Sequence, residues 1–306
     1  MDTQLIGVVL VLLVVVSLPL FAVRHLFTSW RKGAVTRAAQ FFLFLCVIEG
    51  ALMAWGFLVE PGAVSLTHLE HVIPELPRDW TCRIAQLSDL HIENDADTPP
   101  RLERALGLVA SFQPDLVFLT GDYLNRRNGE PLLEAFVRRL ASMAPVLAVP
   151  GNWEGFFPLG LDVVQRTGVT VLDGTTRTVE VRGRKIGVIG LPVNDVSPLE
   201  RLENEVAGAN VRVVLTHTPD LIDDCAARPL DLYFCGHTHG GQFRLPWYGA
   251  VITLTRSGKK YEAGPYRVGR LLAYTSRGLG MEGAIAPRVR FLCPPEVLGL
   301  TLVGGR

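Results

Sequence analysis

Cysteine is scarce in this chain and is not arranged for metal or redox chemistry. The 306 residues include five cysteines, and no two of them form a CxxC pair. This spacing excludes a zinc knuckle and a thioredoxin-like redox motif. Several of the cysteines lie in apolar, strand-like runs, where a small buried thiol is the common arrangement.

The chain also lacks an excess of charge of either sign. Thirty basic and thirty acidic residues give a formal net charge of zero at pH 7. The sequence has no internal repeat, no low-complexity linker and no basic stripe with interleaved aromatic side chains. A protein dedicated to nucleic-acid binding is therefore not expected.

Two long apolar runs are present at the N-terminus. Residues 4–23 are uncharged, and this length matches the roughly 20 residues that a bilayer-spanning helix needs. Residues 38–59 form a second run that is interrupted only by Glu49. A cleaved signal peptide is the alternative for the first run, but that run lacks a basic start and is longer than a usual signal core. We expect residues 1–60 to form a membrane anchor of two transmembrane helices.

The charges around these runs predict an orientation. The segment between the runs is basic and the segment after them is acidic, through Arg24, Arg31, Lys32 and Arg37 in the first and Glu60, Glu70 and Glu75 in the second. Cationic loops stay on the cytoplasmic side of a membrane. The sequence therefore predicts a multi-pass protein of the cell membrane, with residues 61–80 as a connector and the large C-terminal part on the non-cytoplasmic side.

From residue 81 onward the pattern is that of one α/β domain, residues 81–306. Short β-branched runs alternate with amphipathic stretches and Gly/Pro turns. The expected strands are 83–92, 115–123, 144–152, 211–217, 231–239, 249–254, 270–276, 288–293 and 297–303, and the expected helices are 99–112 and 130–143.

Polar residues follow the ends of five of these apolar strands. They are Asp89, His91, Asp122, Asn152, His217, His237 and His239. Any one of them alone is explained as a turn former. Together they are not, because four of the seven histidines of the chain lie at these strand ends. Open α/β sheets bind ligands beyond the carboxyl ends of their strands, so we expect the seven side chains to converge there.

This set of side chains favours a pair of metal ions. Imidazole, carboxylate and amide oxygen suit Mn, Fe or Zn, and the absence of thiolate disfavours softer ions. Seven ligands are too many for one catalytic ion that keeps an open position. Two ions that share a bridging carboxylate, roughly 3.5–4 Å apart, would use all seven and could clamp the oxygens of a displacement at phosphorus.

Five short blocks carry a resemblance to a known family. In chain order they are DLH, GDY, GNWE, THTP and GHTHGGQ. They resemble the signature blocks of the calcineurin-like metallophosphoesterases. The C-terminal part, with YTSRGLGMEG and PRVRFLCPPEVLGLTL, is similar to the branch that contains small bacterial membrane-associated phosphoesterases. The resemblance covers residues 81–306 and leaves the two apolar runs outside.

The resemblance implies a fold, a metal centre and a reaction. The fold is a four-layer α/β/β/α sandwich of two mixed sheets, here preceded by a transmembrane helical hairpin. The two divalent ions are Mn, Fe or Zn, and a hydroxide that bridges them attacks phosphorus. The ligands it implies are Asp89, His91 and His239 for one ion, Asn152, His217 and His237 for the other, and Asp122 as the bridge.

The chain departs from the family at Trp153. The family block is Gly-Asn-His, and the His contacts the phosphate and helps the leaving oxygen; here Trp153 follows Asn152. An indole donates one hydrogen bond but transfers no proton near pH 7, and general acid catalysis is worth roughly 10²–10⁴-fold. Either the substrate needs little protonation, as a phosphoanhydride does, or Glu154 or Tyr123 supplies the acid, or the domain mainly binds. We favour the first interpretation because the ligand set is complete; a packed aromatic beside the site is the plainer alternative.

Arg277 is a further candidate, as a phosphate contact. It precedes the glycine-rich stretch 278–283, which matches the dinucleotide-binding fingerprint literally. Pro287 follows too soon for the helix that this fingerprint requires, so an active-site loop is the better interpretation. A surface arginine is the alternative for Arg277.

The substrate class is predicted from the anchor. A crevice near a bilayer suggests a lipid-linked phosphate or pyrophosphate, or an exported phosphodiester, although a pair of helices could also be a simple tether. The sequence thus predicts a membrane-anchored binuclear-metal hydrolase of phosphodiester or phosphoanhydride bonds. The alternative is a metal-binding membrane sensor with little turnover.

Overall fold

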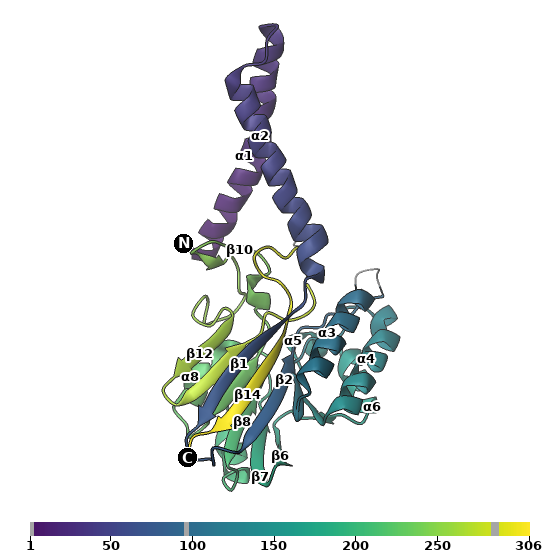
Figure 1. Cartoon of the computed structure of the whole chain (residues 1–306), viewed down its shortest axis with the longest axis vertical. Coiled ribbons are helices and arrows are strands. Elements are labelled where there is room, and N and C mark those ends of the chain that lie inside the picture. The colour runs from purple at the N-terminus through teal and green to yellow at the C-terminus, as the bar shows by residue number, and fades with distance from the viewer. Residues whose placement is uncertain (1–2, 95–97, 283–287) are drawn as a thin grey trace.

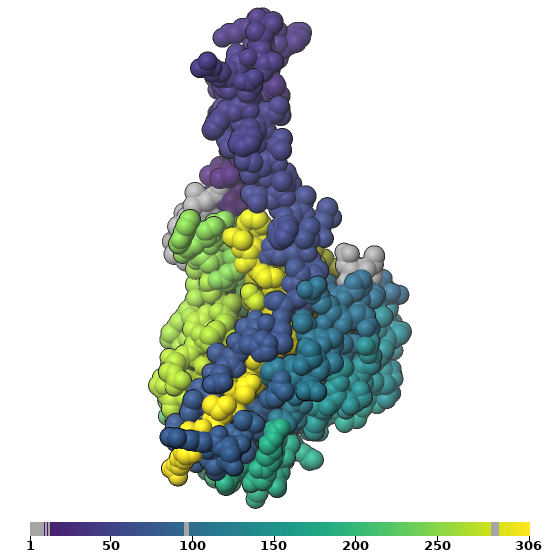
Figure 2. Space-filling view, in the orientation of Figure 1, coloured from purple at the N-terminus to yellow at the C-terminus, as the bar shows by residue number. Residues whose placement is uncertain are grey.

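The N-terminal region is a helical hairpin that projects from the rest of the protein. The computed structural model describes residues 3–94, 98–282 and 288–306. Helix α1 spans Thr3–Arg31 and helix α2 spans Arg37–Ala54. The side chain of Thr36 caps α2 by accepting a hydrogen bond from the Ala39 N–H at 3.2 Å. The two helices form the stalk at the top of Figures 1 and 2.

Helix α1 is longer than the first apolar run of the sequence, residues 4–23. Helix α1 continues past residue 23, so the basic segment is mostly helical and the turn itself is short. After α2 the chain forms a π-helical turn, η1 (Trp55–Val59), and a 3₁₀ turn, η2 (Glu60–Gly62). Two stretches, Leu13–Arg31 and Arg37–Gly62, are long and apolar enough to cross a membrane by length and composition. Their uncovered apolar surface suggests membrane association.

The first sheet contains six strands in the order β1-β14-β2-β3-β4-β5. The strands are β1 (Ser65–Ile73), β14 (Glu296–Gly304), β2 (Thr81–Leu87), β3 (Leu116–Leu119), β4 (Val146–Ala148) and β5 (Thr170–Val171). Only the β14–β2 pair is antiparallel among these, so the sheet is mixed. Strand β1 lies within the segment that the sequence presents as a connector, residues 61–80, and it pairs with β14 along its whole length.

The second sheet also contains six strands, in the order β12-β13-β9-β8-β7-β6. They are β12 (Gly264–Val268), β13 (Leu271–Thr275), β9 (Leu232–Cys235), β8 (Val211–Leu215), β7 (Arg184–Gly190) and β6 (Thr175–Val181). The inner strands are parallel and the two outer pairs are antiparallel. Both sheets are therefore mixed, as predicted.

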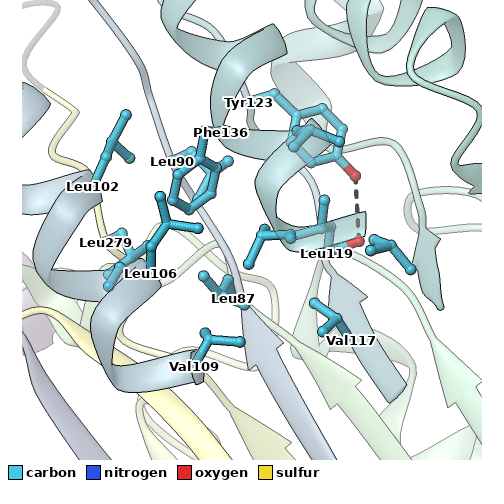
Figure 3. Packing of buried hydrophobic residues seen from close by; sticks show 14 of the residues in the cluster. Leu87, Leu90, Leu102, Leu106, Val109, Val117, Leu119, Tyr123, Phe136 and Leu279 are labelled. Atoms are coloured by element: carbon cyan, nitrogen blue, oxygen red, sulfur yellow. Dashed lines mark hydrogen bonds between the residues drawn. The ribbon is translucent and has the colours of Figure 1, made fainter. Parts of the chain in front are cut away.

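The two sheets pack face to face, with helices on both outer sides. Side chains of both sheets, such as Phe118 and Phe234, fill the layer between them, where these two rings meet at 5.3 Å. The outer face of the first sheet is covered by α3 (Thr98–Phe112), α4 (Glu130–Met143) and α6 (Leu159–Arg166), and that of the second by α7 (Leu199–Glu205) and α8 (Ile222–Ala226). Figure 3 shows Leu102, Leu106 and Val109 of α3 packed beside Leu87 and Leu90. The four-layer α/β/β/α sandwich is confirmed.

Two predicted strands are wrong. Of residues 249–254 only β11 (Gly249–Ala250) is a strand, and it pairs with the short β10 (Arg244–Leu245). Residues 288–293 contain one isolated bridge, between Phe243 and Phe291. The physical reason is the backbone: Leu254 (φ 56°) and Leu292 (φ 52°) are in the left-handed region, which ends an extended run.

Candidate metal centre

The predicted ligands follow the carboxyl ends of strands from both sheets. Strand β2 leads to Asp89 and His91, β3 to Asp122, β4 to Asn152 at the start of α5 (Asn152–Phe156), β8 to His217, and β9 to His237 and His239. The ligand atoms fall into two groups, each within 4.8 Å: Asp89, His91 and His239 in one, and Asp122, His217 and His237 in the other. The structure therefore brings these sequence-predicted residues together at one place.

Asp122 lies between the two groups. Its Oδ2 is 3.5 Å from His91 Nε2 and 3.2 Å from His217 Nε2, so one oxygen faces an imidazole of each group. Within the first group, His239 Nε2 is 3.1 Å from His91 Nε2 and 3.4 Å from Asp89 Oδ1. This is the place that a shared carboxylate needs to occupy.

Asn152 completes the second group. Its Oδ1 lies 2.7 Å from His237 Nδ1, and that nitrogen lies 3.2 Å from His217 Nε2. An amide oxygen and two imidazole nitrogens thus point at one another. Asn152 is the first residue of α5 and directly follows the turn at Gly151, and this position directs its side chain toward His237.

The backbone of the site is strained at the ligands themselves. Five of the seven have positive φ angles, namely Asp89 (51°), His91 (41°), Asp122 (56°), His237 (70°) and His239 (50°). Such conformations cost about 1–3 kcal/mol each and collect at functional sites. Nearby glycines make room: a Cβ on Gly151 would lie 2.1 Å from Asp122 Oδ1, and one on Gly236 would lie 2.2 Å from Asp89 Oδ2.

Hydrogen bonds on the far side of the imidazoles orient them. His217 Nδ1 lies 2.7 Å from the Thr120 carbonyl oxygen, and His91 Nδ1 lies 2.6 Å from Asn125 Oδ1. A carbonyl acceptor places the proton on Nδ1 and leaves Nε2 free to bind a metal. In the described residues His239 Nδ1 is buried without a partner. Asn125 was not predicted as part of the site, although it stands three residues after Asp122.

Burial and mutual charge perturb these groups strongly. Burial raises the pKa of Asp89 to about 7, against the opposing effect of His217. Burial alone would lower the pKa of His217, but the carboxylates Asp122 and Asp89 outweigh it and raise that pKa to about 10. Burial and the neighbouring His217 lower the pKa of His237 to about 4. Without a cation, the buried cluster therefore shares protons among its ligands.

The donor set fits divalent metal ions. Buried carboxylates and neutral imidazoles with nitrogens 3.1 Å apart leave a concentration of lone pairs that a cation would satisfy. Residues of this kind bind Mn, Fe or Zn, and Asp122 of the second group also lies 3.5 Å from His91 of the first.

Trp153 lies at the edge of this cluster. Its backbone N–H donates a hydrogen bond to Asp122 Oδ1 at 2.9 Å. Its indole ring meets the His91 ring edge to face, with the ring centroids 5.9 Å apart. Its side chain also donates a hydrogen bond to the carboxylate of Glu282. Burial and the charge of Asp122 raise the pKa of Glu282. The sequence analysis did not single out Glu282, although it lies in the glycine-rich stretch 278–283 that was interpreted as an active-site loop.

The two acids suggested by the sequence face elsewhere. Glu154 accepts hydrogen bonds from the N–H groups of Gly151, Asp122 and Tyr123, and so holds the turn that carries the ligands. The hydroxyl of Tyr123 donates to the carbonyl oxygens of Leu119 and Val149 in the core; the contact with Leu119 is drawn in Figure 3. Both side chains have structural roles.

Arg277 is also engaged. Its Nη2 donates to Glu296 Oε2 at 2.6 Å and lies 3.4 Å from Thr67 Oγ1, at the β1–β14 edge. This ion pair gives the predicted phosphate contact no support. Gly283 and Pro287, which entered the interpretation of the glycine-rich stretch, lie outside the described residues.

Comparisons with known proteins agree with this site. The family model described as calcineurin-like phosphoesterase matches residues 82–241. The metallophosphoesterase YkuE of Bacillus subtilis is 30% identical over 284 residues, which cover 85% of this chain and 94% of that protein. The phosphodiesterase YaeI of Escherichia coli is 30% identical over 231 residues, 72% of this chain and 82% of that protein.

A third relative acts on a different kind of bond. It is the UDP-2,3-diacylglucosamine pyrophosphatase LpxG of Chlamydia muridarum, which is 24% identical over 306 residues and covers 79% of this chain and 90% of that protein. The relatives thus include a phosphodiesterase and a pyrophosphatase. The chain belongs to the calcineurin-like phosphoesterases, metal-dependent hydrolases of phosphoric esters.

Proposed function

We propose that this protein is a membrane-anchored phosphoesterase that uses two divalent ions to hydrolyse phosphodiester or phosphoanhydride bonds in lipid-linked substrates. The observation that carries the proposal is the position of Asp122 between two groups of buried ligands. Residues 1–60 act as the anchor, and the basic segment between the apolar runs keeps the hydrolase domain on the non-cytoplasmic side.

A candidate set of ligands is available for each of the two proposed ions. Asp89, His91 and His239 would hold one, and Asn152, His217 and His237 the other, with Asp122 shared. When bound, such a pair supplies a nucleophile at neutral pH and neutralises charge on the phosphoryl oxygens. The protein contributes the orientation of the imidazoles, through Thr120 and Asn125, and the rigid left-handed turns that carry the ligands.

The leaving group is where Trp153 restricts the reaction. The indole has no proton to transfer near pH 7, so it offers only packing and a hydrogen bond. A phosphoanhydride releases a phosphate, which needs little protonation. The relative LpxG, a UDP-2,3-diacylglucosamine pyrophosphatase, supports both this bond type and an acylated substrate. The apolar hairpin supports the same substrate class.

Glu282 is a second candidate for the group that protonates the leaving oxygen. Trp153 holds its carboxylate, and the raised pKa of Glu282 extends its protonated form to higher pH. A protonated carboxyl at this position would serve alkyl leaving groups. Glu282→Gln would then slow alkyl phosphodiesters by about 10²-fold and leave nitrophenyl esters nearly unchanged. Equal effects on the two substrates would remove Glu282 from this role.

The proposed function is tested on the full chain in detergent or nanodiscs. Metal content is measured first, and Mn, Zn and Fe are then supplied with an aryl phosphodiester, an aryl phosphomonoester and a pyrophosphate-linked lipid. We expect close to two ions per chain and turnover of the diester and the lipid. Bound metal without hydrolysis of any of the three would instead favour a membrane sensor.

A further inference from the structure

Three large apolar side chains are held in water by a strained backbone. Trp247, Leu254 and Leu292 have positive φ angles of 63°, 56° and 52°. Their side chains are 105%, 74% and 49% exposed. Left-handed conformations are unfavourable for bulky residues, and glycine or asparagine would fit better. Apolar exposure and backbone strain at the same three positions indicate a contact that is made outside this chain.

These three residues, the apolar rim, adjoin the metal centre. The carbonyl oxygen of Leu254 lies 3.2 Å from His237 Nε2. Close to Leu292 in the chain, the Cys293 thiol lies 3.1 Å from the carbonyl oxygen of His239. Trp247 and Leu292 line one surface hollow with Tyr248 and Arg244. The rim is therefore a border of the site.

The apolar rim also adjoins the end of the hairpin. The N–H of Arg290 donates to the carbonyl oxygen of Gly56 at 3.0 Å, and a Cβ on Gly56 would lie 3.0 Å from Val289. The segment that carries Leu292 is thus packed on η1, directly after α2. Figure 1 shows the base of the hairpin at the same end of the domain as β10, and Figure 2 shows the hairpin rising from that end.

We propose that the apolar rim enters the surface of the lipid bilayer beside the hairpin, so that the metal centre faces the layer of phosphate headgroups. This inference rests on the proposed function, because it gives that site its approach to a lipid-linked phosphate. The bilayer is favoured over a protein partner because the segment that carries Leu292 packs against Gly56, at the end of the apolar hairpin. Tryptophan is also enriched at membrane interfaces.

The surroundings of the rim suit headgroups. The ammonium of Lys259 lies 4.0 Å from the centre of the Tyr248 ring and 3.1 Å from Glu262 Oε2, so an ion pair accompanies the aromatic side chains. An amphipathic border of this kind binds at the level of the headgroups. The acyl chains of a substrate would stay in the bilayer while its phosphate reaches the ligands.

The first test needs no turnover. The full chain is reconstituted in phosphatidylcholine–phosphatidylglycerol vesicles with and without lipids brominated near the headgroup, and fluorescence of the wild type and of Trp247→Phe is compared. We expect the brominated lipids to quench a larger fraction of the emission of the wild type than of Trp247→Phe, because a rim that enters the bilayer places Trp247 close to the bromine atoms. Identical fractional quenching of the two proteins would overturn the proposal, even if the enzyme is active.

The second test uses the positive φ angles. Trp247→Gly and Leu254→Gly introduce a residue that favours these conformations, so the thermal midpoint is expected not to fall. We expect the ratio of kcat/KM for a pyrophosphate-linked lipid in vesicles to that for a soluble aryl diester to fall about tenfold in Trp247→Gly. Val72→Ser, at an exposed apolar position of β1, is the matched control and leaves the ratio unchanged.

The outcomes separate the two proposals. If the wild type hydrolyses neither substrate, the proposed function fails and the quenching result still decides the membrane contact. An unchanged kcat/KM ratio in Trp247→Gly overturns the rim proposal and leaves the hydrolase intact. A second copy of the chain on the rim would appear as a dimer that Trp247→Gly converts to a monomer, without quenching of Trp247; that result also overturns it.

Discussion

The metal centre and the N-terminal hairpin both depart from the usual arrangement of side chains, in which charged groups are exposed and apolar groups are buried. The centre buries charged groups, and the hairpin exposes apolar ones. At the centre, Asp89 and His217 are completely buried, whereas in the hairpin Leu20 and Val23 are each 64% exposed. Buried charge and exposed apolar surface both cost free energy in water. Each region would be stabilised by something outside the chain, divalent cations at the centre and, under the proposed function, lipid around the hairpin.

The two regions also differ in how much precision they need. The centre depends on particular atoms and on left-handed turns at five ligands. The hairpin depends on length and apolar composition, which many sequences satisfy. Single substitutions should therefore destroy the centre and leave the hairpin nearly unaffected.

The largest effect is expected at Asp122. Asp122→Asn removes the charge that both groups of ligands share, and we expect hydrolysis to fall by about 10³-fold, the upper range for loss of one electrostatic group. Metal analysis should show fewer ions per chain. Leu20→Ala in the hairpin and Asp223→Asn, an exposed carboxylate paired with Lys260, should keep activity. Normal metal content and turnover in Asp122→Asn would contradict the shared ligand.

A gain of function is expected at Trp153. Trp153→His adds a group that can protonate a leaving oxygen, so kcat for alkyl phosphodiesters should rise by about 10²-fold. Nitrophenyl esters and anhydrides should change little, because their leaving groups need no proton. Trp153→Phe, which also lacks a transferable proton, is the control. A similar change for all leaving groups would show that Trp153 has only a packing role.

Protons and metal ions should compete at the centre. With its pKa raised to about 10, His217 is protonated at neutral pH in the metal-free protein, and a metal must displace that proton. We expect metal affinity to fall about tenfold for each unit of decreasing pH. Calorimetry in buffers of different ionisation enthalpy would measure the released proton, and pH-independent affinity would contradict the expectation.

The raised pKa values of His217 and Asp89 predict that stability depends on pH differently in the metal-free and the metal-loaded protein. The folded pKa values of His217 and Asp89 lie above the unfolded ones, so their contribution to stability is present at low pH and is lost as pH rises. The metal-free protein should therefore become less stable from about pH 6.5 to pH 10. In the metal-loaded protein His217 has already lost its proton, and the unfolded chain loses the same proton near its ordinary pKa, so the stability of this form should stay nearly level over the same range. Thermal midpoints at several pH values check both slopes.

The candidate site was more predictable than the fold around it. Asp89 and Asp122 follow the neighbouring strands β2 and β3, whose carboxyl ends lie side by side, so these two residues were expected to meet. His217 follows β8 of the second sheet, and it joins them because the two sheets pack face to face. The two long helices of the hairpin were predictable for a similar reason, because each follows from the length and apolar composition of its run; that they span a membrane stays a prediction. Both predictions depend on local pattern.

What the sequence did not reveal depends on long-range contacts. Strand β1 was missed because its edge position leaves His68 and Glu70 exposed, so the run does not look like a buried strand. Residues 288–293 look like a strand, but the buried Arg290 donates to the carbonyl oxygens of Arg277 and Cys293 and so folds the segment as a loop. Glu282 likewise reaches Trp153 only through the path of its loop.

The smallest effect is expected where the two regions meet. Glu60, at the end of the hairpin, is buried and accepts hydrogen bonds from the Cys293 N–H and from the Trp55 indole, and Cys293 in turn contacts the carbonyl oxygen of His239. Glu60→Ala leaves the Cys293 N–H unpaired, so the free energy of unfolding should fall by about 1–3 kcal/mol.

The comparison between the regions is sharpened by what else Glu60→Ala changes. Because the contact continues to His239, we expect metal affinity to fall a few-fold as well, whereas Glu60→Gln, whose amide oxygen can accept the same hydrogen bond, should retain both properties. Glu70→Ala, an exposed position on β1, is the control. If stability falls and metal affinity does not, the hairpin supports the domain without influencing the centre, and the two regions are independent. If stability and metal affinity fall together, the hairpin helps to position the metal ligand His239. Another pair of helices with the same length and apolar composition would then not replace this hairpin.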